Sequence, residues 1–191
     1  TITEKGARWV EGGHPWIYAA EVLRTPEGLE NGALADAVSE KGKYLGTGFV
    51  SRESKIRLRL VSRNANDRFD SAFWKRRLQY AWNYRKTVMG AQDLACCRVI
   101  FGEADGFPGL TVDRFGPLLV TQTLSVGMER IKGMLFPLLV RVLEEDGQEI
   151  TGLFERNDVA IRTLEGLEQN KGWFPLEGKP LPESPVTEIC E

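Results

Sequence analysis

Acidic side chains surround the turn signals of one short stretch, residues 98–116, which reads RVIFGEADGFPGLTVDRFG. Its acids Glu103, Asp105 and Asp113 lie close enough in sequence to suggest a metal site. A calcium loop of the EF-hand type does not fit, because its first acid and its glycine are further apart than the three residues from Glu103 to Gly106. The stretch therefore predicts strands joined by tight turns, in which the acids cap turn amides or pair with nearby arginines.

The other candidates for covalent or acid–base chemistry are one histidine and three cysteines. His14 has no identifiable nucleophile or carboxylate partner, so we expect it to make a structural hydrogen bond. Cys96 or Cys97 could act as a nucleophile, but no cofactor motif accompanies them. Together with Cys190 they form no CxxC pair, and their odd number argues against a secreted disulfide framework. The cysteines therefore favour a cytoplasmic protein.

Basic residues gather in the middle of the chain, although the net charge of the whole sequence is only −2. Residues 41–86 contain thirteen Lys and Arg against three Asp and Glu, a balance of +10, and both flanking segments are acidic. Within this segment, the alternation of residues 55–61 places Lys55, Arg57 and Arg59 on one strand face, where their repulsion requires compensation by acids or by phosphate. The segment thus indicates either a nucleic-acid patch or an ordinary solvated surface.

The elements that would position these residues fall into two groups. Short strands with glycine turns between residues 32 and 61 predict a small β-barrel, and the glycines suggest a bulge or a close backbone approach. A polar joint at 64–70 follows, and its aspartates can cap a helix that ends near Met89. The joint therefore marks a domain boundary.

Beyond this helix, the sequence predicts the strands of the acidic stretch and a second helix from Met128 to about Glu145, kinked by an internal proline. Further strands are predicted at 150–155 and 159–164. The segment 172–185, rich in Gly and Pro, predicts a linker, and the residues after it look like the opening of another strand. The expected fold class is α+β, with a small barrel followed by a small α/β sandwich.

Three stretches of this sequence resemble one family of bacterial and archaeal proteins. They are GHPW at 13–16, GEADGFPGLTVDRFG at 102–116 and the pattern ERND…R…EGL within 155–167. All three are similar to those of ribosomal RNA large subunit methyltransferase I and its relatives, which methylate C5 of a cytosine. The resemblance implies an N-terminal PUA domain, a central α/β domain and a C-terminal Rossmann-like domain that binds S-adenosylmethionine.

On this resemblance we expect a PUA-like RNA-binding domain at 1–68, a central α+β domain at 69–168, and a linker at 169–191 that opens the next domain. The sequence shows no glycine-rich turn between a strand and a helix of the kind that binds such a cofactor. We therefore expect the Rossmann-like methyltransferase domain to be absent from this chain, and no catalytic, cofactor-binding or metal-binding residue to lie in it.

The function expected from these observations is that of the RNA-binding N-terminal portion of an S-adenosylmethionine-dependent 23S rRNA (cytosine-C5) methyltransferase. This portion would be inactive alone and would position rRNA for a catalytic domain outside it, which would bind the cofactor. The residues predicted to bind RNA are Lys41, Lys43, Arg52, Lys55, Arg57, Arg59 and Arg63.

Two alternatives remain open at this point. The chain could be a stand-alone RNA or ribosome adaptor without catalytic activity, or a protein-interaction domain whose basic middle meets an acidic partner. Ribosomal RNA is the expected partner, no apolar run is long enough for a membrane span, and a homodimer through the apolar face of the second predicted helix is a further possibility.

Overall fold

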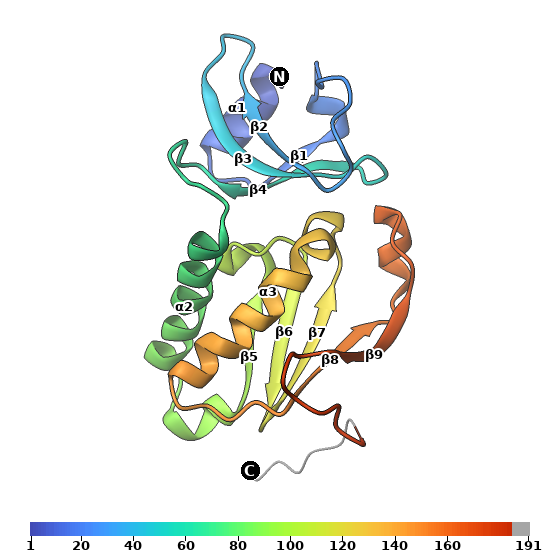
Figure 1. Ribbon diagram of the computed structural model, residues 1–191. Helices are drawn as coiled ribbons and strands as arrows, with labels where there is room; N and C mark the ends of the chain where they lie inside the picture. The colour runs from blue at the N-terminus through green and yellow to red at the C-terminus, as the bar shows by residue number, and fades with distance from the viewer. Residues whose placement is uncertain (185–191) are drawn as a thin grey trace.

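The computed structural model describes residues 1–184, which form two lobes stacked one above the other (Figure 1). The N-terminal lobe ends with a strand that closes at Ser62, and an irregular connection leads from there to a helix that begins at Ser71. This connection coincides with the polar joint expected at residues 64–70. None of the helices in residues 1–184 combines the length and the apolar character that a membrane span requires.

The N-terminal lobe is built on a four-stranded antiparallel sheet in the order β1-β4-β3-β2. Its elements are α1 (Glu4–Glu11), β1 (Trp16–Tyr18), the 3-10 helix η1 (Ala19–Glu21), β2 (Leu34–Val38), β3 (Tyr44–Val50) and β4 (Ile56–Ser62). The alternation of β4 places Leu58 and Leu60 in the core of this lobe. Gly48 of β3 lies so close to the backbone of Arg59 that an added Cβ would overlap it, as expected for a glycine in this strand.

The second lobe is built on a five-stranded sheet in the order β5-β6-β7-β8-β9. Its elements are α2 (Ser71–Val88), the 3-10 helix η2 (Ala91–Ala95), β5 (Cys96–Phe101), the 3-10 helix η3 (Gly102–Asp105), β6 (Leu110–Phe115), β7 (Leu118–Thr123), α3 (Val126–Glu145), β8 (Gly152–Asn157), the 3-10 helix η4 (Ala160–Glu165) and β9 (Asn170–Phe174). Neighbouring strands are antiparallel except β7 and β8, which are parallel and joined through α3.

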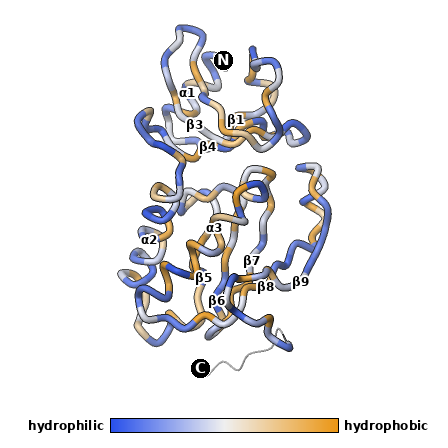
Figure 2. Tube along the Cα trace, viewed as in Figure 1, coloured by the Kyte–Doolittle hydropathy of each residue, from blue (hydrophilic) through white to orange (hydrophobic). Residues whose placement is uncertain are grey.

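The core of the second lobe lies between its helices and its sheet. In Figure 1, α3 crosses one face of the sheet and α2 packs beside it, and Figure 2 shows hydrophobic residues along α3, β5 and β6. Asp70 and Ser125 begin the two helices, because each side chain accepts a hydrogen bond from a backbone amide of the first turn. The helix α3 continues through Pro137, where the sequence predicted a kink or a new segment.

The region after β8 differs from the expected strand. Residues 159–164 fall largely in η4, a 3-10 helix, rather than in a strand. The physical reason is the buried side chain of Arg162, which turns inward while Ile161 and Leu164 are 54% and 65% exposed. A half-buried strand would instead bury every second apolar residue.

The expected linker also differs from the structure in part. Residues 170–174 form β9, which pairs antiparallel with β8 and extends the sheet to five strands. The ring of Trp173 packs edge-on against Phe154, with centroids 5.1 Å apart, and this contact holds the strand in place. The further strand expected at 186–190 lies outside the described residues.

Candidate functional site

The first residues of the 102–116 stretch lie at the contact between the two lobes. We call this contact the joint, and it is distinct from the polar connection at 64–70. The stretch begins with η3, whose Glu103 accepts a 2.7 Å hydrogen bond from Nε1 of Trp16 in β1. The same carboxylate lies 3.4 Å from Nη1 of Arg59 in β4. One acid of the second lobe thus contacts two strands of the N-terminal lobe.

Arg59 completes this joint from the N-terminal lobe. Its Nη2 donates a 2.9 Å hydrogen bond to Oε1 of Glu165, and the two side chains are only 12% and 3% exposed. Arg59 therefore lies between two carboxylates of the second lobe, and its Nε is buried without a hydrogen-bond partner among residues 1–184. The positive charge of the basic face of β4 was expected to need acids or phosphate nearby. At Arg59 the acids Glu103 and Glu165 of the same chain compensate it.

The other acids of the stretch also have structural partners. Asp105 accepts hydrogen bonds from the guanidinium of Arg85 and, at 2.6 Å, from the backbone amide of Phe101. Asp113 accepts from Nε of Arg98 at 2.7 Å. The expectation that these acids cap turn amides or pair with arginines is confirmed, and the described residues contain no cluster that could hold a metal ion.

Two glycines of the stretch are required by the backbone conformation of the turn, and Gly109 is required by close packing as well. Gly106 and Gly109 both have φ near +80°, which side chains rarely adopt. An added Cβ on Gly106 would overlap the guanidinium of Arg77, and one on Gly109 would lie 2.7 Å from Cβ of Ser125. The turn therefore packs directly against α2 and the start of α3.

The ERND pattern braces the second lobe from inside. The buried Asn157 accepts a 2.8 Å hydrogen bond from the amide of Thr123 and donates to Glu155. Glu155 also pairs with Lys132 of α3 at 2.8 Å. Burial lowers the pKa of Lys132, but its hydrogen bonds to Glu129 and Glu155 outweigh this, so that its pKa is raised. These residues hold β7, β8 and α3 together.

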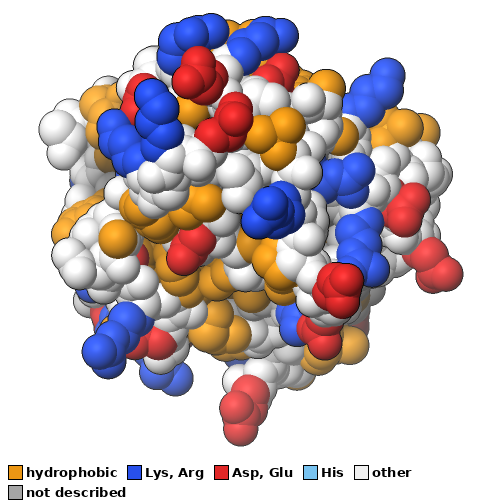
Figure 3. Space-filling view, turned by 90° about the horizontal axis from the view of Figure 1, so that it is seen from above, with side chains coloured by type: hydrophobic (Ala, Val, Ile, Leu, Met, Phe, Trp, Pro, Cys, Tyr) orange, Lys and Arg blue, Asp and Glu red, His pale blue; other side chains and the backbone are white. Residues whose placement is uncertain are grey.

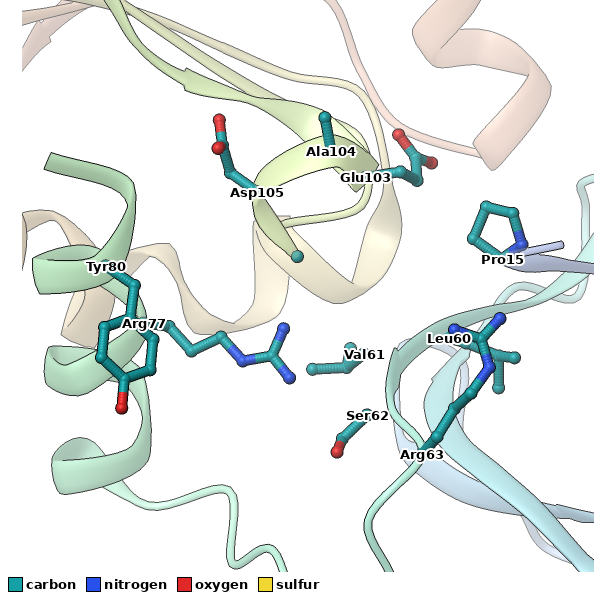
Figure 4. Close-up of a pocket in the computed structure, with 11 residues that line it drawn as sticks. Pro15, Leu60, Val61, Ser62, Arg63, Arg77, Tyr80, Glu103, Ala104 and Asp105 are labelled. Carbon is teal, nitrogen blue, oxygen red and sulfur yellow. The ribbon is translucent and has the colours of Figure 1, made fainter. Parts of the chain in front are cut away.

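A cleft of about 450 Å³ lies beside η3, between the N-terminal lobe and α2 (Figure 4). Its walls include Pro15, Ser62 and Arg63 from the N-terminal lobe, Arg77 and Tyr80 from α2, and residues 103–106. In Figure 4 the side chain of Arg77 extends from α2 toward β4, and Arg63 lies on the opposite wall. Sequence reasoning did not assign Arg77 to the site.

The predicted RNA-binding residues differ in what they contact within the chain. Figure 3 looks down on the N-terminal lobe and shows Lys and Arg side chains separated by Asp and Glu side chains. Lys43 pairs with Glu11 at 2.6 Å, and Arg59 is held in the joint. Arg52, Arg57 and Arg63 donate to backbone carbonyls. Lys41 is exposed, and the exposed Lys55 lines a second cleft of about 660 Å³.

The cations of α2 are also largely paired within the chain. Lys75 pairs with Glu145 at 2.7 Å, and Lys86 pairs with Asp146 at 2.5 Å. The hydrogen bond from Lys86, together with one from Trp82, keeps the pKa of Asp146 below its usual value. Part of the basic balance of residues 41–86 is therefore used in ion pairs that join elements.

The remaining chemical candidates are placed in structural roles or left exposed. Nδ1 of His14 accepts a 3.1 Å hydrogen bond from the amide of Trp16, which agrees with the expected structural role. Cys97 is buried, and burial raises the pKa of its thiol, which opposes the thiolate form that a nucleophile needs. Cys96 is exposed.

The turn from β7 into α3 is the one place in residues 1–184 where a strand leads through a helix to a parallel strand. Such turns bind cofactors in Rossmann-like folds when the helix start is open. Here Glu165 accepts from the amide of Val126 at 3.4 Å, and Oγ of Ser125 accepts from the amide of Met128 at 3.4 Å. Gly127 packs against Phe49 of the other lobe, whose ring an added Cβ would overlap. We therefore assign no cofactor to this helix start.

Comparisons with known proteins agree with this architecture. Residues 1–63 match the PUA-like domain family. The chain is 38% identical over 177 residues to ribosomal RNA large subunit methyltransferase I of Klebsiella pneumoniae, a match that covers 92% of this chain and 42% of that protein. The protein of the same name from Escherichia coli is 37% identical over 166 residues, or 87% of this chain and 40% of the relative. The chain thus spans less than half the length of these relatives.

Solved structures show the same fold at low sequence identity. A putative SAM-dependent methyltransferase from Streptococcus mutans aligns with 94% of this chain and 44% of its own, with a TM-score of 0.71 and 16% identity. A second putative methyltransferase, crystallised with SAH, aligns with 81% of this chain and 39% of its own, with a TM-score of 0.68 and 15% identity.

These findings correct two expectations. The fold class was wrong in excluding the methyltransferase fold, because solved methyltransferases align with nearly all of the chain and the second lobe contains a five-stranded sheet with a parallel strand–helix–strand unit. The function was wrong in restricting the chain to an inactive binding module or an adaptor, because the relatives that align along it are methyltransferases. The absence of a glycine-rich turn was not sufficient to exclude this fold, because a fold is defined by the arrangement of its strands and helices.

Both the sequence match and the PUA-like domain confirm the resemblance seen in the three motifs. Over most of its own length, this chain is similar to ribosomal RNA large subunit methyltransferase I, and it covers less than half of the length of those relatives.

Proposed function

We propose that this chain is part of an S-adenosylmethionine-dependent methyltransferase that acts on ribosomal RNA. The observation that carries the proposal is the 38% identity along 92% of the chain to a protein named for this activity. A PUA-like domain at residues 1–63 supports RNA as the substrate. The ion pairs of the joint support a single binding surface formed by both lobes, because Arg59 fixes one lobe against the other.

The proposed cofactor is S-adenosylmethionine, which when bound supplies the methyl group. In the part of the chain that the structure describes, the start of α3 does not fit it, since Glu165, Ser125 and Phe49 already occupy that position. The ion pairs of Arg59 are assigned to holding the lobes together, and the residues of the cleft between the lobes to binding and orienting RNA.

The RNA-binding residues remain a prediction, and their contacts in the structure make some of them better suited to bind phosphate than others. Arg59 is the least suited to bind phosphate, because its charge is already compensated by two carboxylates. Lys41 and Lys55 are exposed, and Arg63 lines the cleft between the lobes. Contacts of this kind make binding fall steeply with salt, by a slope of about 0.7 in log K against log salt for each phosphate of a single strand. A cytoplasmic location and a homodimer remain predictions.

The intact protein tests this proposal. Incubation with methyl-labelled S-adenosylmethionine and ribosomal RNA is expected to transfer label to the RNA, and mapping of the labelled base tests the expectation of cytosine C5. Transfer should fall when the salt concentration is raised, because phosphate contacts weaken. The ribosomal RNA is taken from cells that lack this protein, so that its target base is still unmodified. Absence of label in that RNA would contradict the proposal.

A further inference from the structure

We propose that the cleft between the lobes binds a phosphate of single-stranded RNA, with Arg77 as its main ligand. This inference deepens the proposed function and rests on it. It assigns to RNA a residue of α2 that lies outside the PUA-like domain matched at residues 1–63. Lys75, Arg76 and Arg77 lie in the first turns of α2, at the end of the helix where its dipole disfavours cations.

The position of Arg77 is set by its neighbours. Its guanidinium stacks over the ring of Phe73 at 4.9 Å from the centroid. It also lies against Gly106, where any side chain would overlap it. A long side chain between a ring and a bare backbone turn loses much of its rotamer freedom before any ligand arrives, which lowers the entropic cost of binding.

The charge of Arg77 has no partner in the described part of the chain. Its guanidinium makes no ion pair and no side-chain hydrogen bond among residues 1–184, unlike Lys75, Arg85 and Lys86 of the same helix. Burial lowers the pKa of Arg77, and the nearby Asp67 partly opposes this. A partly buried cation without a counterion is costly, and an anionic ligand would offset that cost.

The acids around the cleft already accept hydrogen bonds from other residues. Glu103 accepts from Trp16, and Asp105 accepts from Arg85 and from a backbone amide. In Figure 4 both carboxylates point away from the guanidinium of Arg77. The third nearby acid, Asp67, accepts from Ser62 and Asn64. The cleft therefore presents a positive charge to a ligand.

The facing wall and the rim suit a nucleotide. Arg63 stands on the opposite wall, and among residues 1–184 its guanidinium donates only to the carbonyl of His14, at 3.1 Å. Tyr80 at the rim is 63% exposed, so a base can stack on its ring. Planar guanidinium groups match phosphate oxygens in a bidentate manner, and a volume of about 450 Å³ lies within the range of ligand pockets.

The test compares two neighbouring arginines in the intact protein. The probe is a fluorescein-labelled, unstructured RNA of ~20 uridines, long enough to cross such a site, and binding is measured by anisotropy. Arg77→Gln should weaken binding about tenfold, because it removes a charge-assisted contact to phosphate. Arg76→Gln is the matched control, since Arg76 is exposed and does not line the cleft, and it should change binding less than about twofold.

A second variant and a competitor sharpen the result. Arg63→Gln, on the facing wall, should also weaken RNA binding more than Arg76→Gln does. Arg77→Lys should lose less affinity than Arg77→Gln, because it keeps the charge. Polyglutamate of equal charge should compete poorly with the RNA. Competition as strong as that of RNA would overturn the assignment in favour of an acidic protein partner.

Two outcomes distinguish a failure of the Arg77 assignment from a failure of the proposed function. If the wild type binds the RNA and Arg77→Gln weakens binding no more than Arg76→Gln, the assignment of Arg77 is wrong while the proposed function stands. If the wild type binds no RNA at any salt concentration, both are wrong.

Discussion

Removing Arg59 should strongly destabilise the folded chain, because this side chain neutralises two acids across the joint. The perturbation is Arg59→Met, which keeps a long apolar stem and deletes the charge. It leaves Glu165, whose side chain is 3% exposed, without its cation, whereas Glu103 is 25% exposed and keeps its bond from Trp16. The cost therefore comes mainly from Glu165.

The magnitude follows from the burial of that acid. Breaking a buried ion pair by removing one partner costs about 3–5 kcal/mol. The lower end applies here, because Nε of Arg59 is unsatisfied already and Glu165 retains the amide of Val126. We therefore expect a loss of about 3 kcal/mol in the free energy of unfolding, a large part of the ~5–15 kcal/mol typical of a folded domain.

Urea unfolding followed by tryptophan fluorescence measures this loss. Arg57→Met is the control, because Arg57 lies on the same strand and, within the described residues, donates only to two backbone carbonyls, so its loss should cost about 1 kcal/mol. Adding Glu165→Gln to Arg59→Met should recover about 1 kcal/mol or more, since it removes the unpaired buried charge. Equal losses for the two arginine variants, or no recovery in the double variant, would refute the reasoning.

Three further predictions test the packing, the pH dependence and the cysteines. Gly127→Ala should lower the free energy of unfolding by at least ~2 kcal/mol through its clash with the other lobe, whereas Gly133→Ala, in open space on the same helix, should raise it by ~0.5–1 kcal/mol; urea unfolding compares them. Asp146→Asn should cost about 1 kcal/mol or less at neutral pH, and the difference from wild type should vanish as pH falls from 3.8 through the lowered folded-state pKa; equal loss at all pH values would contradict the ion pair. In the folded chain iodoacetamide should label Cys96 before Cys97, as peptide mass spectrometry would show, and the reverse order would contradict the buried thiol.

The helices and the turn chemistry could be predicted from the sequence because their causes are local. Asp70 caps its helix as expected, Asp105 accepts from the backbone amide of Phe101, and Asp113 pairs with Arg98. Each of these interactions spans few residues, except where the chain doubles back as a hairpin. The period-two pattern of β4 likewise placed its apolar residues in the core.

The partners of the basic residues could not be predicted, because they lie far apart in the sequence. Arg59 and Glu165 are separated by 106 positions, and nothing in the local pattern relates them. A count of charges therefore could not show which of the cations the fold uses in ion pairs, as it does Arg59. The same count gave no special weight to Arg77, whose importance depends on a cleft that exists only when the lobes meet.

The last strand of the sheet was not predicted for a similar reason. Residues 170–174 carry the glycine and polar residues of a linker, and only the partner strand β8 makes them a strand. The parallel pairing of β7 with β8 also depends on α3 crossing the sheet, which a strand pattern alone does not specify.

The central claim is that the cleft between the lobes holds ribosomal RNA for a methyltransferase. Initial rates of methyl transfer from labelled S-adenosylmethionine by the intact protein, measured against ribosomal RNA concentration, test it most directly. We predict that Arg77→Gln raises KM for the RNA about tenfold and leaves kcat within about twofold, while Arg76→Gln changes neither. Equal KM values for the two variants, or an absence of methyl transfer by the wild type, would contradict the claim.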